Sequence, residues 1–264
     1  MKAAINGIKI DYRDEGKGLP VIFIHAFPLN QTMWDEQVAA LKGRFRAVTL
    51  DLRGFGNSDA PEGPYFMEQM AADVRGLMSE LAIDRAALVG LSMGGYISLA
   101  FYRNYPDAVR ALVLADTRAG ADTPEGRERR YKSAEKALAQ GAGAIADDMV
   151  PIALGASTRE SRPEVVARMR RIVEANSPRG IAAAQRGMAE RPDSTAMLAD
   201  ITCPALIIVG DEDGLTPVAE AETLHRGIQG SRLEVIASAG HLSNLECPEE
   251  FNAALVEFLE SLPA

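Results

Sequence analysis

Short runs of branched aliphatic residues recur along the chain, and amphipathic or alanine-rich stretches separate them. Most of these runs are apolar at nearly every position, which is typical of strands covered on both faces in a mostly parallel sheet. The runs lie at 20–27, 45–52, 85–91, 108–116, 204–213 and 231–238. The helical patterns lie at 33–42, 66–81, 94–104, 217–227 and 248–261. This alternation predicts an open, doubly wound α/β sheet.

The first run, GIKIDYRD at residues 7–14, follows a different pattern. Its apolar positions alternate with polar ones, and Gly16-Lys17-Gly18 follows it. Alternation is typical of a strand with one face toward solvent. We therefore expect this run to form half of an antiparallel hairpin at one edge of the sheet.

Residues 119–195 interrupt the alternation of strands and helices. They contain four helical patterns that glycine and proline divide, and no convincing strand. A crossover between two parallel strands needs only one helix. We therefore interpret this segment as a helical cap (lid) inserted into a core domain, with residues 1–118 and 196–264 forming the core and residues 119–195 forming the cap.

Composition and charge narrow the classes of function. The chain has 264 residues, a formal net charge of −9, two cysteines and three histidines. Binding of nucleic acid needs a basic surface, so we expect no nucleic-acid partner. The first residues gain charge quickly and no apolar stretch reaches about 20 residues, so we expect no secretory signal, no membrane contact and a cytoplasmic location. The sequence predicts neither a metal site nor a cofactor. It is compatible with a homodimer.

The stretch VGLSMGGY at 89–96 carries the candidate chemistry. A strand runs into Ser92 and a helix begins at about Gly94, which places a G-x-S-x-G pattern at a strand–turn–helix junction. Such a turn raises the serine hydroxyl above the sheet and leaves no room for a Cβ at the flanking glycines. A serine that only caps the helix would not require this set of glycines. We therefore interpret Ser92 as a nucleophile.

A nucleophilic serine needs a base, and the base needs an acid that holds its tautomer. His241 follows the last apolar run through a Gly-containing loop, so it is the candidate base. The acid is expected at Asp213, which lies deeper in the loop after residues 204–210 than Asp211 does. Asp211 and Asp116 are the alternatives. The resulting order of serine, aspartate and histidine along the chain is the one expected for this strand architecture.

The negative charge that forms on a substrate oxygen needs two hydrogen-bond donors. The backbone N–H of Met93 is one candidate, and the N–H of Phe27, in the loop after the strand at 20–24, is the other. The arginines at 127, 129 and 130 are expected to form a solvated face, with attraction of a substrate carboxylate as the alternative. Methionine and tryptophan often pack in ordinary cores. The candidate pocket residues are His25, Trp34, Met149, Ile152 and Met188.

These residues resemble the α/β-hydrolase superfamily over nearly the full chain, and most closely its 3-oxoadipate enol-lactonase-like esterases and lactonases. The resemblance implies the α/β-hydrolase fold, a mostly parallel, eight-stranded, doubly wound sheet with a helical cap insertion. It also implies Asp213 as the acid and His241 as the base. Ala26 stands where many relatives carry glycine. The segments that carry the resemblance are HAFPLNQTMW (25–34), DLRGFGNSD (51–59), VGLSMGG (89–95), LADTRAGADTPEGR (114–127), GDEDGLTP (210–217) and AGHLSNLECPEEF (239–251).

The residues and the resemblance together predict a serine hydrolase. Its partner would be a small carboxylic ester or lactone, which it would cleave through an acyl-enzyme. A serine at the turn argues against haloalkane dehalogenases and epoxide hydrolases, which attack with a carboxylate. Three alternatives stay open: a cofactor-free perhydrolase, a hydrolase of carbon–carbon bonds that uses the same triad, and a non-catalytic ligand receptor on the same fold.

Overall fold

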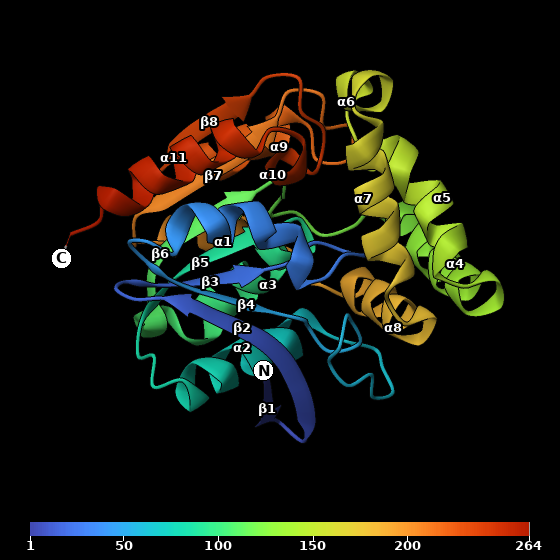
Figure 1. Cartoon of the computed structure of the whole chain (residues 1–264), viewed down its shortest axis with the longest axis horizontal. Helices are drawn as coiled ribbons and strands as arrows, with labels where there is room; N and C mark the ends of the chain where they lie inside the picture. Colours follow the sequence, from blue (N-terminus) through green and yellow to red (C-terminus); the bar gives the residue numbers. More distant parts are fainter. Residues whose placement is uncertain (264) are drawn as a thin grey trace.

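The computed structural model describes residues 1–263, which fold around one sheet of eight strands (Figure 1). The strands lie in the order β1-β2-β4-β3-β5-β6-β7-β8. All neighbours from β4 to β8 pair in parallel. The predicted α/β-hydrolase fold with a mostly parallel sheet is therefore confirmed. The strands are β1 (Lys2–Ile5), β2 (Ile8–Gly16), β3 (Pro20–Ile24), β4 (Arg46–Leu50), β5 (Ala86–Leu91), β6 (Val109–Ala115), β7 (Ala205–Gly210) and β8 (Arg232–Ile236).

The N-terminal strands form the predicted antiparallel hairpin. β1 pairs with β2 across the two-residue turn Asn6-Gly7, and β2 pairs antiparallel with β4. Asn6 and Gly7 both have positive φ angles, 49° and 80°. Asn-Gly is the residue pair that such a tight hairpin turn favours. The alternating pattern of 7–14 thus marks the strand that joins the parallel sheet to its antiparallel edge.

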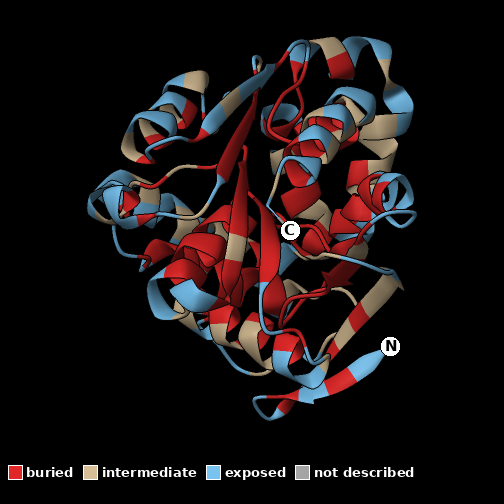
Figure 2. Ribbon diagram, turned by 90° about the vertical axis from the view of Figure 1, so that its left-hand side faces the viewer, coloured by how far each residue is buried: buried red, intermediate tan, exposed pale blue. Residues whose placement is uncertain are grey.

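Two layers of helices cover the sheet. α1 (Asp35–Leu41) and α11 (Pro248–Glu260) pack on one face, and α2 (Met67–Glu80), α3 (Met93–Asn104) and α9 (Val218–Gly227) pack on the other (Figure 1). Along β3, Ile22 and Ile24 join the core under α2 and α3, while Val21 and Phe23 join the core under α1. Successive strand residues face opposite sides. Continuous apolar runs therefore fill two cores at once (Figure 2).

The last strand departs from the predicted pattern. We expected β8 to be covered on both faces, but three of its five residues are exposed. β8 is the edge of the sheet and pairs only with β7. Its charged residues Arg232 and Glu234 suit an edge strand, because charge at an edge opposes pairing with other chains.

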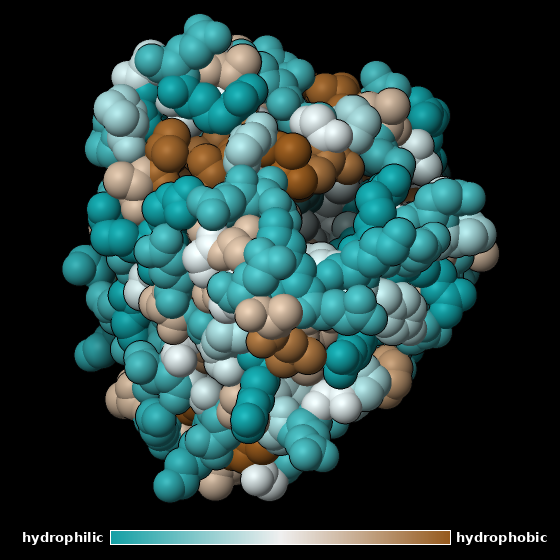
Figure 3. Space-filling model, turned by 90° about the vertical axis from the view of Figure 1, so that its right-hand side faces the viewer, coloured by the Kyte–Doolittle hydropathy of each residue, from teal (hydrophilic) through white to brown (hydrophobic). Residues whose placement is uncertain are grey.

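Five helices connect β6 to β7 at one end of the sheet, on the right of Figure 1. The sequence predicted four of them, and α6 is the additional short helix. The space-filling view of this side shows a largely hydrophilic face with a band of apolar residues and a hollow beside it (Figure 3). No helix within residues 1–263 is long and apolar enough to cross a membrane. The five helices are α4 (Pro124–Gln140), α5 (Ala142–Ala153), α6 (Ala156–Ser161), α7 (Pro163–Glu174) and α8 (Pro178–Ala189).

A buried ion pair joins the loop after β4 to α2. The Arg53 guanidinium donates to both carboxylate oxygens of Asp73, at 2.6 and 2.7 Å. Asp73 also accepts a hydrogen bond from the side chain of Asn6 at 2.9 Å. The two charged side chains are 5% and 0% exposed. Each charge therefore relies on the other, because neither can be solvated by water.

Asp73→Ala should lower the free energy of unfolding by about 3–5 kcal/mol, since it leaves the Arg53 charge buried and unpaired. Urea denaturation followed by circular dichroism measures this loss. Glu128→Ala, which removes half of an exposed pair with Lys132, is the matched control and should leave stability unchanged. Equal midpoints for the two variants would contradict the interpretation of the buried pair.

Candidate active site

Ser92 occupies a strained turn between β5 and α3. Its φ and ψ angles are 56° and −112°, a backbone conformation that residues other than glycine rarely adopt. Its N–H donates to the carbonyl oxygen of Ala115 at 2.9 Å, and the Thr117 hydroxyl donates to its carbonyl oxygen at 2.8 Å. These bonds hold the turn against the end of β6. The Ser92 side chain makes no capping hydrogen bond to α3, so it is not a simple helix cap.

The glycines around Ser92 allow this turn to form. A Cβ on Gly90 would lie 2.3 Å from the carbonyl oxygen of Gly94, and a Cβ on Gly94 would lie 2.1 Å from the carbonyl oxygen of Ile24. Both distances are shorter than van der Waals contact with backbone atoms that cannot move aside. The prediction that side chains at these positions would collide with the helix and the neighbouring strand is confirmed.

His241 and Asp213 lie beside Ser92, although 149 residues separate Ser92 from His241. The Ser92 Oγ lies 2.8 Å from Nε2 of His241. The Nδ1 of the same ring lies 2.8 Å from Oδ2 of Asp213. The side chains of His241 and Asp213 are 4% and 0% exposed. The structure thus brings together the three side chains that the sequence proposed as nucleophile, base and acid.

The His241 imidazole and hydrogen bonds from residues 215 and 216 keep Asp213 ionised. Its Oδ1 accepts the N–H groups of Leu215 and Thr216 at 2.8 and 2.9 Å, and the Thr216 hydroxyl donates to its Oδ2 at 2.6 Å. Burial alone would raise the pKa of Asp213, but the nearby imidazole and these hydrogen bonds lower it below its ordinary value. Burial alone would lower the pKa of His241, but the Asp213 charge raises it overall. A neutral His241 therefore donates from Nδ1 and accepts at Nε2.

The two alternative acids are not placed as Asp213 is. Asp211 is exposed. Asp116 is buried near the imidazole, but its Oδ1 accepts the N–H of Gly210 at 3.0 Å, and its Oδ2 accepts the Ser243 hydroxyl at 2.5 Å. Burial and the charge of Asp213 raise the pKa of Asp116 well above its ordinary value. Asp116 thus links the end of β7 to the start of α10, and both of its carboxylate oxygens are engaged there.

A buried carboxylate holds the loop that carries His241. Glu246, in α10 (Ser243–Glu246), accepts the N–H groups of Gly240 and Leu242, at 3.0 and 3.2 Å. These are the two residues that flank His241. The other oxygen of Glu246 accepts the N–H of Gly155, between α5 and α6, at 2.8 Å. The same carboxylate therefore fixes the His241 loop and attaches it to the helical segment.

Two backbone amides beside Ser92 have no acceptor within the described chain. These are the N–H of Met93, at the start of α3, and the N–H of Phe27, in the loop after β3. A helix N-terminus favours negative charge. Ala26 does not have a positive φ angle, so alanine fits at the position where many relatives carry glycine. Both amides that the sequence selected are thus free to donate to a bound oxygen atom.

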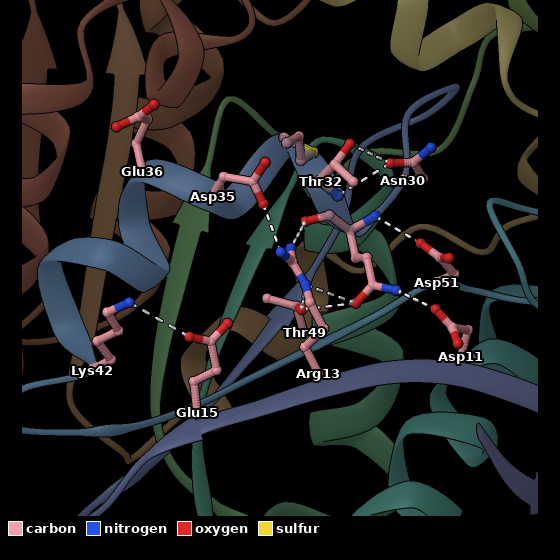
Figure 4. Close-up of polar contacts among 12 residues, drawn as sticks. Asp11, Arg13, Glu15, Asn30, Thr32, Asp35, Glu36, Lys42, Thr49 and Asp51 are labelled. Carbon is pink, nitrogen blue, oxygen red and sulfur yellow. Dashed lines mark hydrogen bonds and ion pairs between the residues drawn. The ribbon is translucent and has the colours of Figure 1, made fainter. Parts of the chain in front are cut away.

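A polar network anchors the loop that carries Phe27 (Figure 4). The 3₁₀ helix Gln31–Trp34 follows this loop, and the Gln31 N–H donates to Asp51 at 2.9 Å. The Gln31 side chain donates to Asp11 at 2.8 Å and accepts from the Thr49 hydroxyl at 2.9 Å. Arg13 donates to the Gln31 carbonyl oxygen at 3.1 Å. The far end of the loop is therefore fixed to β2 and β4.

His25 anchors the near end of the same loop and does not line the pocket. Its Nδ1 lies 2.9 Å from the carbonyl oxygen of Ala26, and its Nε2 accepts the N–H of Leu52 at 3.0 Å. Burial lowers its pKa to about 4, so the ring stays neutral. The prediction that His25 is a pocket residue is wrong, because both ring nitrogens already bind backbone groups.

A cavity of about 130 Å³ opens over Ser92 and His241. Phe27, Met149 and Met188 line it, as the sequence proposed. Trp34 does not, because it is fully buried and packs between Phe23 and Phe251 under α1. Ile152 does not either, because it is 49% exposed on the outside of α5. These two pocket predictions are wrong, because an apolar side chain in these segments can also be buried in the core or exposed on the surface.

About half of the residues that line the cavity were not predicted from the sequence. Arg130 was expected on a solvated face, yet it lines the cavity. Helical spacing could have indicated Tyr96, which lies one turn after Ser92 on α3. Nothing in the sequence placed the other residues against the serine. The lining residues that were missed are Tyr96, Arg118, Arg130, Gln185, Leu215 and Thr216.

Similarity to known proteins agrees with this geometry. Among curated proteins, 3-oxoadipate enol-lactonase 2 of Acinetobacter baylyi is 32% identical over 242 residues, covering 89% of this chain and 86% of its own length. A thermophilic esterase of Thermogutta terrifontis, solved with malate bound, is 42% identical with a TM-score of 0.97, and the match covers 100% of this chain and 99% of that one. The enol-lactonase of Burkholderia xenovorans LB400 is 34% identical with a TM-score of 0.93, covering 99% and 100%.

The sequence also matches a protein family over most of its length. Residues 20–248 match the family described as the alpha/beta hydrolase fold. This range includes the turn at Ser92, both loops that carry Asp213 and His241, and all five helices between β6 and β7. The sheet order, the serine turn and the matched sequence lead to one conclusion: the chain belongs to the alpha/beta hydrolase family.

Proposed function

We propose that this protein is a carboxylic ester hydrolase that cleaves small esters or lactones through a covalent acyl-enzyme. One observation carries the proposal: the Ser92 hydroxyl, the His241 imidazole and the Asp213 carboxylate form a continuous chain of contacts, each 2.8 Å long. The esterase and enol-lactonase activities named for the relatives support the same class of reaction.

Each group has a role in the proposed reaction. His241 Nε2 accepts the Ser92 proton as Oγ attacks the carbonyl carbon, and Asp213 stabilises the imidazolium that forms. The amides of Phe27 and Met93 donate to the oxyanion. His241 then protonates the leaving alkoxide, and the acyl group stays on Ser92. Water gives a proton to His241 and attacks this ester, and His241 returns the proton to Ser92 Oγ as the acid leaves.

The helical segment between β6 and β7 acts as the cap of this site. Met149 on α5 and Met188 on α8 form part of the cavity wall, and such a cover excludes water while the reaction proceeds. The cavity of about 130 Å³ is smaller than the roughly 300–1,000 Å³ pockets that hold drug-sized ligands. We therefore expect short acyl groups to be preferred over long ones.

Ser92→Ala should reduce kcat for p-nitrophenyl butyrate by about four to six orders of magnitude, because no other group can form the acyl-enzyme. The release of p-nitrophenol measures this effect. Ser79→Ala, at an exposed serine of α2, should retain full activity. Steady turnover by folded Ser92→Ala protein would exclude the proposed mechanism.

Activity should fall on acidification, because only neutral His241 can accept the Ser92 proton. The Asp213 carboxylate raises the His241 pKa above 6.5, so the acid limb of kcat/KM should have its midpoint above that value. Asp213→Asn removes the charge and should move the limb to lower pH as well as reduce the rate. A wild-type midpoint below 6.5 would contradict the role of Asp213.

Glu246→Gln should reduce kcat by about 10- to 100-fold with little change in KM. The side-chain amide of the glutamine would place an N–H group against a backbone N–H and so shift the His241 loop. A displacement of about 1 Å can reduce the rate by this factor. Because the Glu246 charge also raises the His241 pKa, the acid limb should move to lower pH.

Glu250→Gln, at an exposed position on α11, is the control for this change and should match the wild type. Unchanged kcat and an unchanged pH profile in Glu246→Gln would show that the buried carboxylate does not position the base.

A further inference from the structure

One side chain of the proposed cap contacts both loops that lie beneath it. Asn176 lies between α7 and α8 and is 3% exposed. Its Nδ2 donates to the carbonyl oxygen of Pro28 at 2.8 Å, and its Oδ1 accepts the N–H of Gly56 at 2.7 Å. The same Nδ2 also donates to the carbonyl oxygen of Ile172, on α7, at 2.9 Å. The amide group therefore links the loop after β3 and the loop after β4 to the cap.

The partners of Asn176 require an amide at this place. The carbonyl oxygens of Pro28 and Ile172 can only accept hydrogen bonds, and the N–H of Gly56 can only donate one. An asparagine side chain carries two donors and an acceptor oxygen on one planar group, and all of them are used here. A carboxylate of equal size would satisfy Gly56 alone and would place an oxygen against both carbonyl oxygens.

The Pro28 contact lies next to a candidate oxyanion donor. Pro28 directly follows Phe27, whose N–H has no acceptor within the described chain. The carbonyl oxygen of Ala26, which belongs to the same peptide unit as that N–H, accepts the N–H of Leu29 at 2.9 Å. The turn of the loop therefore holds one side of Phe27, and Asn176 holds the other side.

The Gly56 contact ties the second loop to the same point. Gly56 directly follows Phe55, and the rings of Phe27 and Phe55 meet edge to face with their centroids 6.3 Å apart. Asp51, at the start of this second loop, accepts the N–H of Gln31 at 2.9 Å (Figure 4). The two loops are thus joined to each other beneath the cap, and the asparagine amide connects both of them to it.

We propose that Asn176 is a positioning residue for hydrolysis, which holds the loop after β3 so that the Phe27 amide points at the oxygen of the substrate carbonyl. This inference rests on the proposed function. Asn176 does not line the cavity, so it acts through the backbone and makes the cap part of the oxyanion site. Loss of one oxyanion donor reduces kcat by about 10²- to 10³-fold, and its displacement should have a smaller effect of the same kind.

The first test replaces Asn176 by aspartate. Asn176→Asp keeps the size of the side chain and the Gly56 contact but removes both donors. Above neutral pH, kcat for p-nitrophenyl butyrate should therefore fall about 10- to 100-fold with little change in KM. Asn57→Asp is the matched control, because it adds the same charge to the loop after β4 at an exposed position, and it should match the wild type. An unchanged kcat in Asn176→Asp would overturn the proposal.

The pH dependence separates positioning from a general loss of stability. Burial and the two facing carbonyl oxygens should raise the pKa of the introduced carboxyl group, and its protonated form can again donate to Pro28. The rate of Asn176→Asp relative to the wild type should therefore rise as the pH falls. A ratio that stays flat or falls on acidification would overturn the proposal.

A second variant covers the case in which the aspartate disturbs folding. Asn176→Ser has a small polar side chain that is too short to reach Pro28 and Gly56 together, and it introduces no group that titrates. It should lose kcat to a similar extent as Asn176→Asp above neutral pH, and this loss should be the same at every pH. Wild-type kcat in Asn176→Ser would contradict a positioning role.

A transition-state analogue tests the same point without turnover. Trifluoromethyl propyl ketone should bind as a hemiketal: Ser92 Oγ bonds to the carbonyl carbon, its proton moves to His241, and the carbonyl oxygen takes the electron pair of the broken π bond as an oxyanion. Its inhibition constant should rise in both Asn176 variants by about the factor by which kcat/KM falls. The inhibition constant of methyl propyl ketone, which binds without forming an oxyanion, should not change.

The outcomes distinguish this inference from the proposed function. Equal affinity of the wild type and both Asn176 variants for the fluorinated ketone would overturn the positioning role and leave the proposed hydrolase intact. If the wild type neither hydrolysed p-nitrophenyl butyrate nor bound the fluorinated ketone, the proposed function itself would fail and this inference with it.

Discussion

The close contact between α3 and the strands beneath it is the constraint on which the site depends. Gly94 lies so near the end of β3 that a single added carbon would meet the Ile24 carbonyl oxygen at 2.1 Å. Ser92, directly before α3, has a positive φ angle at this close contact. The same contact brings the first amide of α3 beside the loop after β3. Ser92 and both free amides therefore lie around one packing contact, and the buried residues around Ser92 support its strained backbone.

A second constraint is the placement of several buried carboxylates around one imidazole. Asp213 binds the ring directly, Asp116 binds Ser243 and the backbone of β7, and Glu246 binds backbone amides on both sides of His241. Each has its own donors, so none competes for the ring. Because Gly155 also binds Glu246, the junction of α5 and α6 helps to hold the loop that carries His241.

The sequence predicted the fold well, because its signals are local or repeat along the chain. Continuous apolar runs identified the parallel strands, and the glycines around Ser92 identified the turn. The convergence of Ser92, Asp213 and His241 could be predicted because each follows a strand, and the carboxyl ends of parallel strands share one edge of the sheet. The pocket was predicted poorly. Trp34 and Ile152 have apolar side chains like those of true lining residues, and only their three-dimensional surroundings place them in the core or on the surface. Arg130 lines the cavity because α4 packs against α8, a contact that no local pattern encodes.

The central claim is that an acyl group becomes attached to Ser92 during turnover. The most direct measurement is mass spectrometry of protein quenched in acid during steady hydrolysis of p-nitrophenyl butyrate, followed by peptide mapping. The account predicts one butyryl group on the peptide that contains Ser92, and no such adduct in Ser92→Ala. Rapid turnover with no adduct on any peptide, or an adduct on another residue, would contradict it.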